Sequence, residues 1–205
     1  MKKEYIVYAI TAILTIATFV TVIKVRKNNI QDKIEVVSEK QVIDELYSFF
    51  RHRNKDVIAN NGIKLNFDLQ IEDQNQKRMS IGDLFINSSS PFKLIISSSS
   101  LGCDICIREE LMILESYIDK IGHENIIIFA SDYNQRALMI LKENLKCDLK
   151  IYQIERINIP FEEKSNNLFI FVLDENFIIK DFFIPEKSLP ELSKDYYEAI
   201  CNKHL

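Results

Sequence analysis

The sequence predicts a mixed α/β domain, with a central sheet flanked by helices, that is preceded by an N-terminal transmembrane helix. Three observations support this fold class. An apolar run without charges occupies residues 5–23. From residue 93 onward, short apolar runs alternate with amphipathic stretches, as they do in a β-α-β unit. Two later apolar runs are separated only by Glu175-Asn176, which is the spacing of a β-hairpin.

Length and charge limit the kinds of protein that this chain can be. The 205 residues are 47% hydrophobic and include only four Gly and four Pro, which suits one globular domain plus a short extra segment. The 26 basic and 30 acidic residues give a formal net charge of −4. Because nucleic-acid binding depends on excess positive charge, we expect no nucleic-acid partner.

The first segment, residues 1–27, is predicted to be a membrane anchor with flanking charges. As a helix, residues 5–23 would span about 28 Å at ~1.5 Å per residue, close to the ~30 Å thickness of the hydrocarbon core of a bilayer. The alternative is a cleaved secretory signal, which has a shorter apolar core and a cleavage site with small residues. Ala17-Thr18-Phe19 is a poor site of that kind, so we expect an uncleaved anchor in contact with membrane lipid.

Flanking charges do not decide the orientation of this anchor. Lys2 and Lys3 precede the span, and Lys24, Arg26 and Lys27 follow it, so the positive charges nearly balance. A short N-terminal tail before a single anchor usually remains inside, while the long C-terminal part is exported. We therefore expect the soluble domain on the extracytoplasmic, periplasmic or outer, face of the membrane.

The segment of residues 28–62 is predicted to be an amphipathic stalk helix or linker. Its apolar residues recur at spacings of three, four and seven, and the pattern ends near Asn60-Asn61-Gly62. Such a helix could pack on its own domain or form a dimerising surface, and the sequence leaves both options open.

Residues 63–205 are predicted to form the α/β domain. Residues 63–71 alternate apolar and polar side chains as a half-buried strand does, and residues 79–85 could return toward the core. The later pattern predicts helices at 103–121, 134–145 and 187–201, and strands at 93–97, 125–131, 148–154, 168–174 and 177–184.

The motif that carries chemistry is Cys103-Asp104-Ile105-Cys106, at the junction of a buried strand and an amphipathic helix. Two cysteines with this spacing on a first helical turn can close a disulfide, and the helix N-terminus favours thiolate. We expect Cys103 to be the attacking sulfur and Cys106 the resolving one. The negative charge of Asp104 disfavours the thiolate form, which favours a reductant over a strong oxidant.

These features resemble the redoxin branch of the thioredoxin-like superfamily, in particular the membrane-anchored thiol-disulfide oxidoreductases of bacterial envelopes. The resemblance extends over about residues 63–200, from the MSIGDLF segment through the CxxC to LFIFVLDENFIIKDFFIP. It implies that Glu109, three residues after Cys106, is a proton acceptor near the buried thiol. The alternative for Glu109 is a solvated helix residue beside Glu110.

The resemblance also places a substrate-binding edge around the cysteines. Gly102, Asp104 and Ile105 lie beside the nucleophile, and the family's cis-proline position aligns with Leu168, after Asn167. This chain has Gly102 where the family has Trp, and it has no proline at residue 168. The substrate-docking edge is therefore altered.

We expect the protein to exchange disulfides with protein disulfide or dithiol partners, and a membrane-located electron donor to recycle the CxxC pair. No cofactor or metal is expected for this reaction. One alternative is a non-catalytic scaffold module with a structural disulfide. The other is a metal site in which the CxxC would supply two ligands, with further ligands from Cys147, Cys201, His123 or His204.

A peroxidase is a minor alternative within the redox interpretation. Ser100 lies three residues before Cys103, as a Thr or Ser does in peroxiredoxins, but Ile96 occupies the position of a proline that they have. We expect Cys147 to be a small buried residue, Cys201 to be exposed, and His204 to lie in a frayed tail.

Overall fold

The computed structural model describes residues 21, 24, 41–86, 88, 90–102, 104–145 and 149–204. The chain divides into two compact units, Met1–His52 and Arg53–Leu205. The predicted membrane span, residues 5–23, lies outside the described residues except for Thr21. Among the residues that are described, no helix is both long enough and apolar enough to cross a bilayer.

A helix at residues 41–60 carries the chain into the second unit. Its part in the first unit exposes apolar side chains, such as Val42, Leu46 and Tyr47. Its residues from Arg53 onward belong to the second unit, where Asn60 is fully buried. The second unit therefore begins earlier than residue 63, where the hydrophobic period changes.

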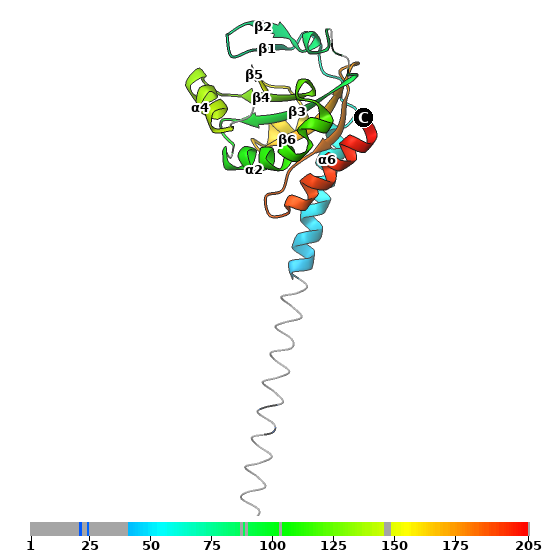
Figure 1. Cartoon of the computed structure of the whole chain (residues 1–205). Helices are drawn as coiled ribbons and strands as arrows, with labels where there is room; N and C mark the ends of the chain where they lie inside the picture. The colour runs from blue at the N-terminus through cyan, green and yellow to red at the C-terminus, as the bar shows by residue number, and fades with distance from the viewer. Residues whose placement is uncertain are drawn as a thin grey trace, which may run out of the picture. The chain divides into compact units, whose positions relative to one another are not determined.

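The described part of the second unit contains one seven-stranded sheet in the order β2-β1-β5-β4-β3-β6-β7. Strands β5, β4 and β3 are parallel. At one side β6 pairs antiparallel with β3, and β7 pairs antiparallel with β6. At the other side β1 pairs antiparallel with β5, and β2 pairs antiparallel with β1. The mixed α/β architecture is thus confirmed (Figure 1). The strands are β1 (Gln70–Glu72), β2 (Arg78–Ser80), β3 (Phe92–Ser99), β4 (Ile126–Ser131), β5 (Lys150–Ile154), β6 (Phe169–Asp174) and β7 (Ile179–Phe183).

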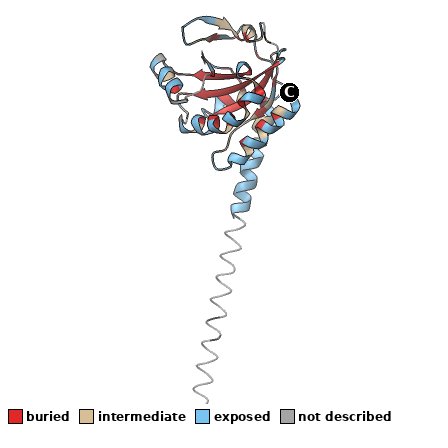
Figure 2. Cartoon of the chain, viewed as in Figure 1, coloured by how far each residue is buried: buried red, intermediate tan, exposed pale blue. Residues whose placement is uncertain are grey.

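Helices cover both faces of this sheet and enclose two apolar clusters. On one face, Ile107 and Leu111 of α2 and Tyr197 of α6 pack against β3, β4 and β6. On the other face, Phe161 of α5 and Ile81 of η1 pack against the same strands. Figure 2 shows the buried central strands between these layers. The helices are η1 (Ile81–Phe85), α2 (Asp104–Leu114), η2 (Glu115–Tyr117), α3 (Ile118–Ile121), η3 (His123–Asn125), α4 (Gln135–Leu145), α5 (Pro160–Lys164) and α6 (Pro190–His204).

The prediction of one strand over residues 63–71 is wrong in extent. Lys64 makes only an isolated antiparallel bridge with Ile178, and β1 begins later, at Gln70. Asn66 causes the interruption, because its carbonyl oxygen accepts from the Leu69 amide and its side chain accepts from the Asp68 amide. Asn side chains form turns of this kind in competition with strand pairing.

The C-terminal residues also differ from expectation. Helix α6 continues to His204, so the predicted frayed tail is wrong. His204 Nε2 lies 2.8 Å from Asp181 Oδ2, and Lys203 Nζ lies 2.6 Å from Asp181 Oδ1. Cys201 was expected to be exposed but is half-buried, because it packs against the cluster that α2 and α6 share.

Candidate functional site

The junction between β3 and α2 places the chemistry-bearing motif at the carboxyl end of the central strand. Ser99 organises this turn: its carbonyl oxygen accepts from the Gly102 amide at 2.9 Å, and its hydroxyl accepts from the Leu101 amide at 3.2 Å. The Ser100 amide donates to the Ser131 carbonyl of β4 at 3.0 Å. Helix α2 then begins at Asp104, so Cys106 lies in its first turn.

Gly102 lies directly against the segment that precedes β6. A Cβ atom at this position would be 2.5 Å from the Asn166 carbonyl oxygen and 3.1 Å from that of Ser99. Real Cβ atoms essentially never approach backbone this closely, so glycine is required for the contact. The β3–α2 turn and the loop that enters β6 are therefore in contact at the residue before Cys103.

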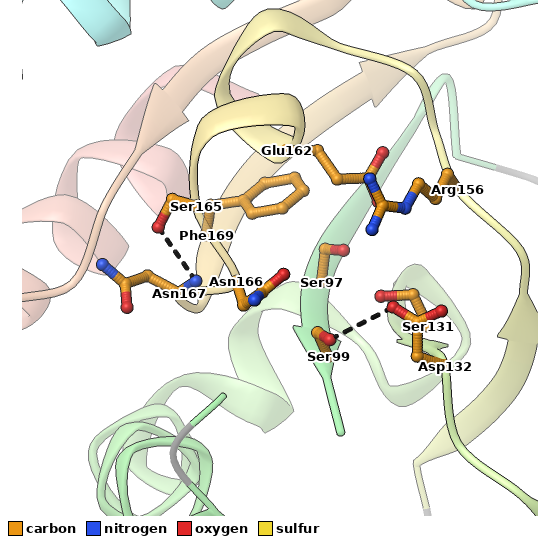
Figure 3. A pocket seen from close by; sticks show the side chains of 10 residues that line it. All are labelled: Ser97, Ser99, Ser131, Asp132, Arg156, Glu162, Ser165, Asn166, Asn167 and Phe169. Carbon is orange, nitrogen blue, oxygen red and sulfur yellow. Dashed lines mark hydrogen bonds between the residues drawn. The ribbon is translucent and has the colours of Figure 1, made fainter. Parts of the chain in front are cut away.

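A small cavity opens beside this contact (Figure 3). Its volume is about 10 Å³, which is room for about one water molecule. Nine of the ten residues that line it have polar or charged side chains, and they come from the carboxyl ends of β3 and β4 and from the segment around α5: Ser97, Ser99, Ser131, Asp132, Arg156, Glu162, Ser165, Asn166, Asn167 and Phe169.

Glu162 is the most deeply buried carboxylate of this cavity, with 8% of its surface exposed. Burial raises the pKa of Glu162, while hydrogen bonds from the Asn158 and Ile157 backbone and the charge of Arg156 oppose the increase. The Asn158 amide donates to Glu162 Oε2 at 2.8 Å. Asn158 has a left-handed φ of 61°, which asparagine adopts more readily than most residues.

The fold is similar to those of solved structures. A thiol:disulfide interchange protein from Bacteroides sp. is 13% identical, with a TM-score of 0.53, and the match covers 70% of this chain and 90% of that one. The chain has a thioredoxin-like fold. The likeness concerns the fold, because the sequence identity is low. It confirms the expected fold.

A second similar structure is an uncharacterised thioredoxin-like protein from Porphyromonas gingivalis. It is 19% identical, with a TM-score of 0.48, and the match covers 71% of this chain and 97% of that one. No family model matches the sequence. No curated protein matches it either.

The structure places the predicted site residues of this thioredoxin-like fold at different depths. Ile105 is 48% exposed on α2, and the Cys106 side chain is half-buried one residue later. Cys103 lies outside the described residues, as does the side chain of Asp104. The assignment of Cys103 as nucleophile stays a prediction.

Glu109 and Glu110 occupy opposite environments on α2. The Glu109 side chain is 46% exposed, and its Oε1 lies 3.3 Å from Lys187 Nζ. This position is that of a solvated helix residue, and a role as proton acceptor remains a prediction. Glu110 is buried and accepts hydrogen bonds from the Tyr197 hydroxyl at 2.6 Å and the Ser193 hydroxyl at 2.9 Å.

The residues predicted to form the docking edge differ in exposure. Asn167 is exposed and its amide donates to Ser165 Oγ at 3.1 Å, whereas Leu168 is buried in the cluster on the α2 side. The residue that meets Gly102 is Asn166, one position before Asn167. Pro160 is the first residue of α5, and the described residues include no cis peptide bond.

Two features of the structure bear on the metal and peroxidase alternatives. Within the part of the chain that the structure describes, no three His, Cys, Asp or Glu residues form a group that could hold a metal ion. Cys147 lies outside the described residues. The Ser100 hydroxyl, the feature shared with peroxiredoxins, donates to the Asp132 carbonyl oxygen at 2.7 Å.

Sequence reasoning missed Glu162 and the helix that carries it. Helix α5 has five residues, too few to show a hydrophobic period. One signal was available, because Pro160 begins the helix and proline is favoured at a first helical position. Nothing in the sequence indicated that Glu162, and not its neighbour Glu163, would be buried.

Proposed function

We propose that this protein is a membrane-anchored thioredoxin-like thiol-disulfide oxidoreductase whose Cys103 and Cys106 exchange disulfides with protein partners. The observation that carries the proposal is the position of the CxxC in the fold. The motif lies where the central strand β3 passes into α2, with Cys106 in the first helical turn and Gly102 against the loop that enters β6. One solved structure with a similar fold is that of a thiol:disulfide interchange protein.

The first turn of α2 suits this chemistry. Its unpaired N–H groups and the partial positive charge of the helix N-terminus stabilise a thiolate. In the proposed reaction, the Cys103 thiolate attacks a partner disulfide and forms a mixed disulfide. Cys106 then attacks Cys103 Sγ and releases the reduced partner. A membrane-located donor of electrons would reduce the pair again.

Exposed apolar side chains near the motif support a protein substrate. Leu101 is 67% exposed and Ile105 is 48% exposed, on either side of Cys103 in the chain. A folded or extended polypeptide can cover these side chains while its disulfide reaches the motif. Gly102, Asp104 and Asn167 complete the proposed docking edge, whereas the Leu168 side chain is buried and is not part of its surface.

Trapping of a mixed disulfide tests this function. In the full chain, solubilised in detergent, Cys106→Ser should leave the first attack intact and block resolution. We expect this variant to accumulate a covalent adduct with an oxidised peptide substrate, which non-reducing mass spectrometry detects. Cys103→Ser should form no adduct. Equal adducts in both variants, or none in either, would contradict the assigned roles.

The alternative is a scaffold protein, which is not an enzyme. In that case the CxxC would form a structural disulfide, and the edge around Leu168 would hold a partner without chemistry. The burial of Leu168 within the core favours a structural role for that side chain itself. Resistance of the Cys103–Cys106 disulfide to physiological reductants would favour the scaffold.

We also propose the location of the domain. Residues 5–23 would anchor the chain in the membrane, and the thioredoxin-like domain would lie on the extracytoplasmic face. The uncharged apolar run and its flanking lysines support the anchor. Compartments outside the cytoplasm also permit disulfide exchange.

A further inference from the structure

The helix at residues 41–60 exposes large apolar side chains in the part that belongs to the first unit. They include Val42, Ile43, Leu46, Tyr47 and Phe50, which are between 37% and 70% exposed. Figure 2 shows this part of the helix as exposed. Apolar side chains gathered on one exposed surface mark an interaction site, because their contact with water is unfavourable.

These side chains form one stripe along the helix. At about 100° per residue they fall within an arc of about 140°, and the polar residues Glu45 and Ser48 lie outside it. Ile43, Phe50 and Val57 are seven residues apart, which is the repeat of helices that pair side by side. Val57 packs against an apolar cluster of the second unit, whereas Ile43 and Phe50 remain exposed.

The charges of this helix argue against a membrane surface as the partner of the stripe. Helices that lie on a bilayer carry Lys and Arg on their polar side, because the headgroups include anionic lipids. Here Asp44 and Glu45 lie beside the stripe, and Arg51 is the one Lys or Arg in residues 41–52. The polar side of the helix therefore favours a protein partner.

We propose that the stripe pairs with the same stripe of a second copy of this chain, with the two helices parallel, when both copies are anchored in one membrane. This inference rests on the proposed membrane anchor and not on disulfide exchange. In a parallel pair, Ile43, Leu46 and Phe50 each lie beside their own copy, so apolar side chains meet along the whole contact.

The anchor favours a second copy and sets the direction of the pair. Every copy reaches residue 41 from the same apolar run, residues 5–23, through the same number of residues. Two copies in one membrane therefore present this helix in the same direction and at the same distance from the bilayer. The stripes can then meet in register.

The shortness of the stripe makes the pair dependent on the membrane. A contact between two helices over residues 42–50 buries less than the ~1,200 Å² of a stable protein interface. Confinement of both copies to one membrane raises their effective concentration and compensates for the small contact. We therefore expect pairs in lipid vesicles and single chains in an excess of detergent micelles.

Photochemical cross-linking of the full chain in lipid vesicles tests the pair. A photoreactive p-benzoylphenylalanine replaces Ile43 in one variant and Phe50 in another. After flotation of the vesicles and irradiation, we expect both variants to give a covalent dimer on a reducing denaturing gel. Mass spectrometry should find each probe attached near its own position, around residue 43 or residue 50 of the second copy.

The matched control has the same probe in place of Ser48, which lies on the opposite side of the helix and is also exposed. We expect this variant to give little dimer. In the chain with the probe at Phe50, Leu46→Glu should lower the dimer yield about tenfold, because two charges would enter the contact. Ser48→Glu, which adds the same charge outside the stripe, should keep the yield.

The outcomes separate this inference from the proposals on which it does and does not depend. If the full chain does not float with vesicles, the anchor and the membrane-dependent pair are both wrong. If it floats but the probes attach to lipid, or give equal dimer from all three positions, the pair is wrong and the anchor stands. A probe at Ile43 that attaches near residue 50 would show an antiparallel pair and contradict the proposal. Trapping of the mixed disulfide tests disulfide exchange independently of these results.

Discussion

The carbonyl oxygen of Asn166 restricts residue 102 to glycine. The sequence alone could not reveal this contact, because it joins residues far apart in the chain. It could predict only that residue 102 adjoins the nucleophile.

Gly102→Ala should therefore destabilise the domain. The added Cβ would lie 2.5 Å from a backbone oxygen, and one of the two segments would have to move. We expect a loss of about 1–3 kcal/mol in the free energy of unfolding, measured by urea denaturation. Gly82→Ala is the control, because its Cβ would meet Ser80 Oγ at 3.3 Å and Phe67 at 3.5 Å. Equal stabilities of the two variants would contradict the steric explanation.

The buried Glu110 leads to a prediction about pH. Burial raises the pKa of Glu110 above its usual 4.5, and the hydrogen bonds from Tyr197 and Ser193 oppose this increase. A carboxyl with a raised pKa in the folded state binds protons more strongly when folded. Its contribution to stability is thus present below pH 4.5 and is lost as the pH rises through the higher, folded-state value.

Tyr197→Phe removes one of these hydrogen bonds and should raise the pKa of Glu110 further. We expect a loss of about 1.5–3 kcal/mol in unfolding free energy, with a larger loss at pH 8 than at pH 5. Tyr196→Phe is the control, because the Tyr196 hydroxyl donates to the Asp181 carbonyl oxygen and not to an ionisable group. Urea denaturation at both pH values distinguishes them. A pH-independent cost of Tyr197→Phe would contradict this account of Glu110.

At the scale of elements, the sequence predicts long apolar runs better than short ones. The eight residues of β3 and the six of β4 and of β6 are all buried, and each strand was predicted from an apolar run, which in β3 covers only part of the strand. By contrast, α5 has five residues and depends on contacts with distant segments. The burial of Glu162 could therefore be recognised only from the structure.

Asn60 provides one of these distant contacts. Its Oδ1 accepts from the Phe161 amide at 3.2 Å, one residue before Glu162, and its Nδ2 donates to the Asp56 carbonyl at 2.6 Å. We expect Asn60→Ala to cost about 1–3 kcal/mol and to increase hydrogen exchange at the Phe161 amide. Asn61→Ala, which removes a bond to the Phe182 amide of β7, should leave exchange at Phe161 unchanged. Unchanged exchange in both variants would show that Asn60 does not hold α5.

At the scale of the whole molecule, the sequence predicted a thioredoxin-like α/β domain, and the fold is confirmed. Alternation of apolar runs with amphipathic helices is a property of the whole chain, so local errors such as the strand at 63–71 did not affect it. The membrane anchor is a separate prediction from the composition of residues 5–23 alone.

The full chain should therefore bind lipid vesicles, and residues 28–205 should not. Burial of the apolar run in the hydrocarbon core supplies the affinity. Flotation of vesicles in a density gradient measures the bound fraction of each form. Equal flotation of the two forms would contradict an anchor at residues 5–23.

A redox titration of the full chain, with reduced thiols trapped by a mass-adding alkylating reagent, tests thiol-disulfide exchange most directly. We predict one reversible two-electron transition within the physiological range of potentials, absent from both Cys103→Ser and Cys106→Ser, with Cys103 the faster-reacting thiol in the reduced protein. A pair that cannot be reduced in this range, or a transition that persists in either variant, would contradict the proposed function.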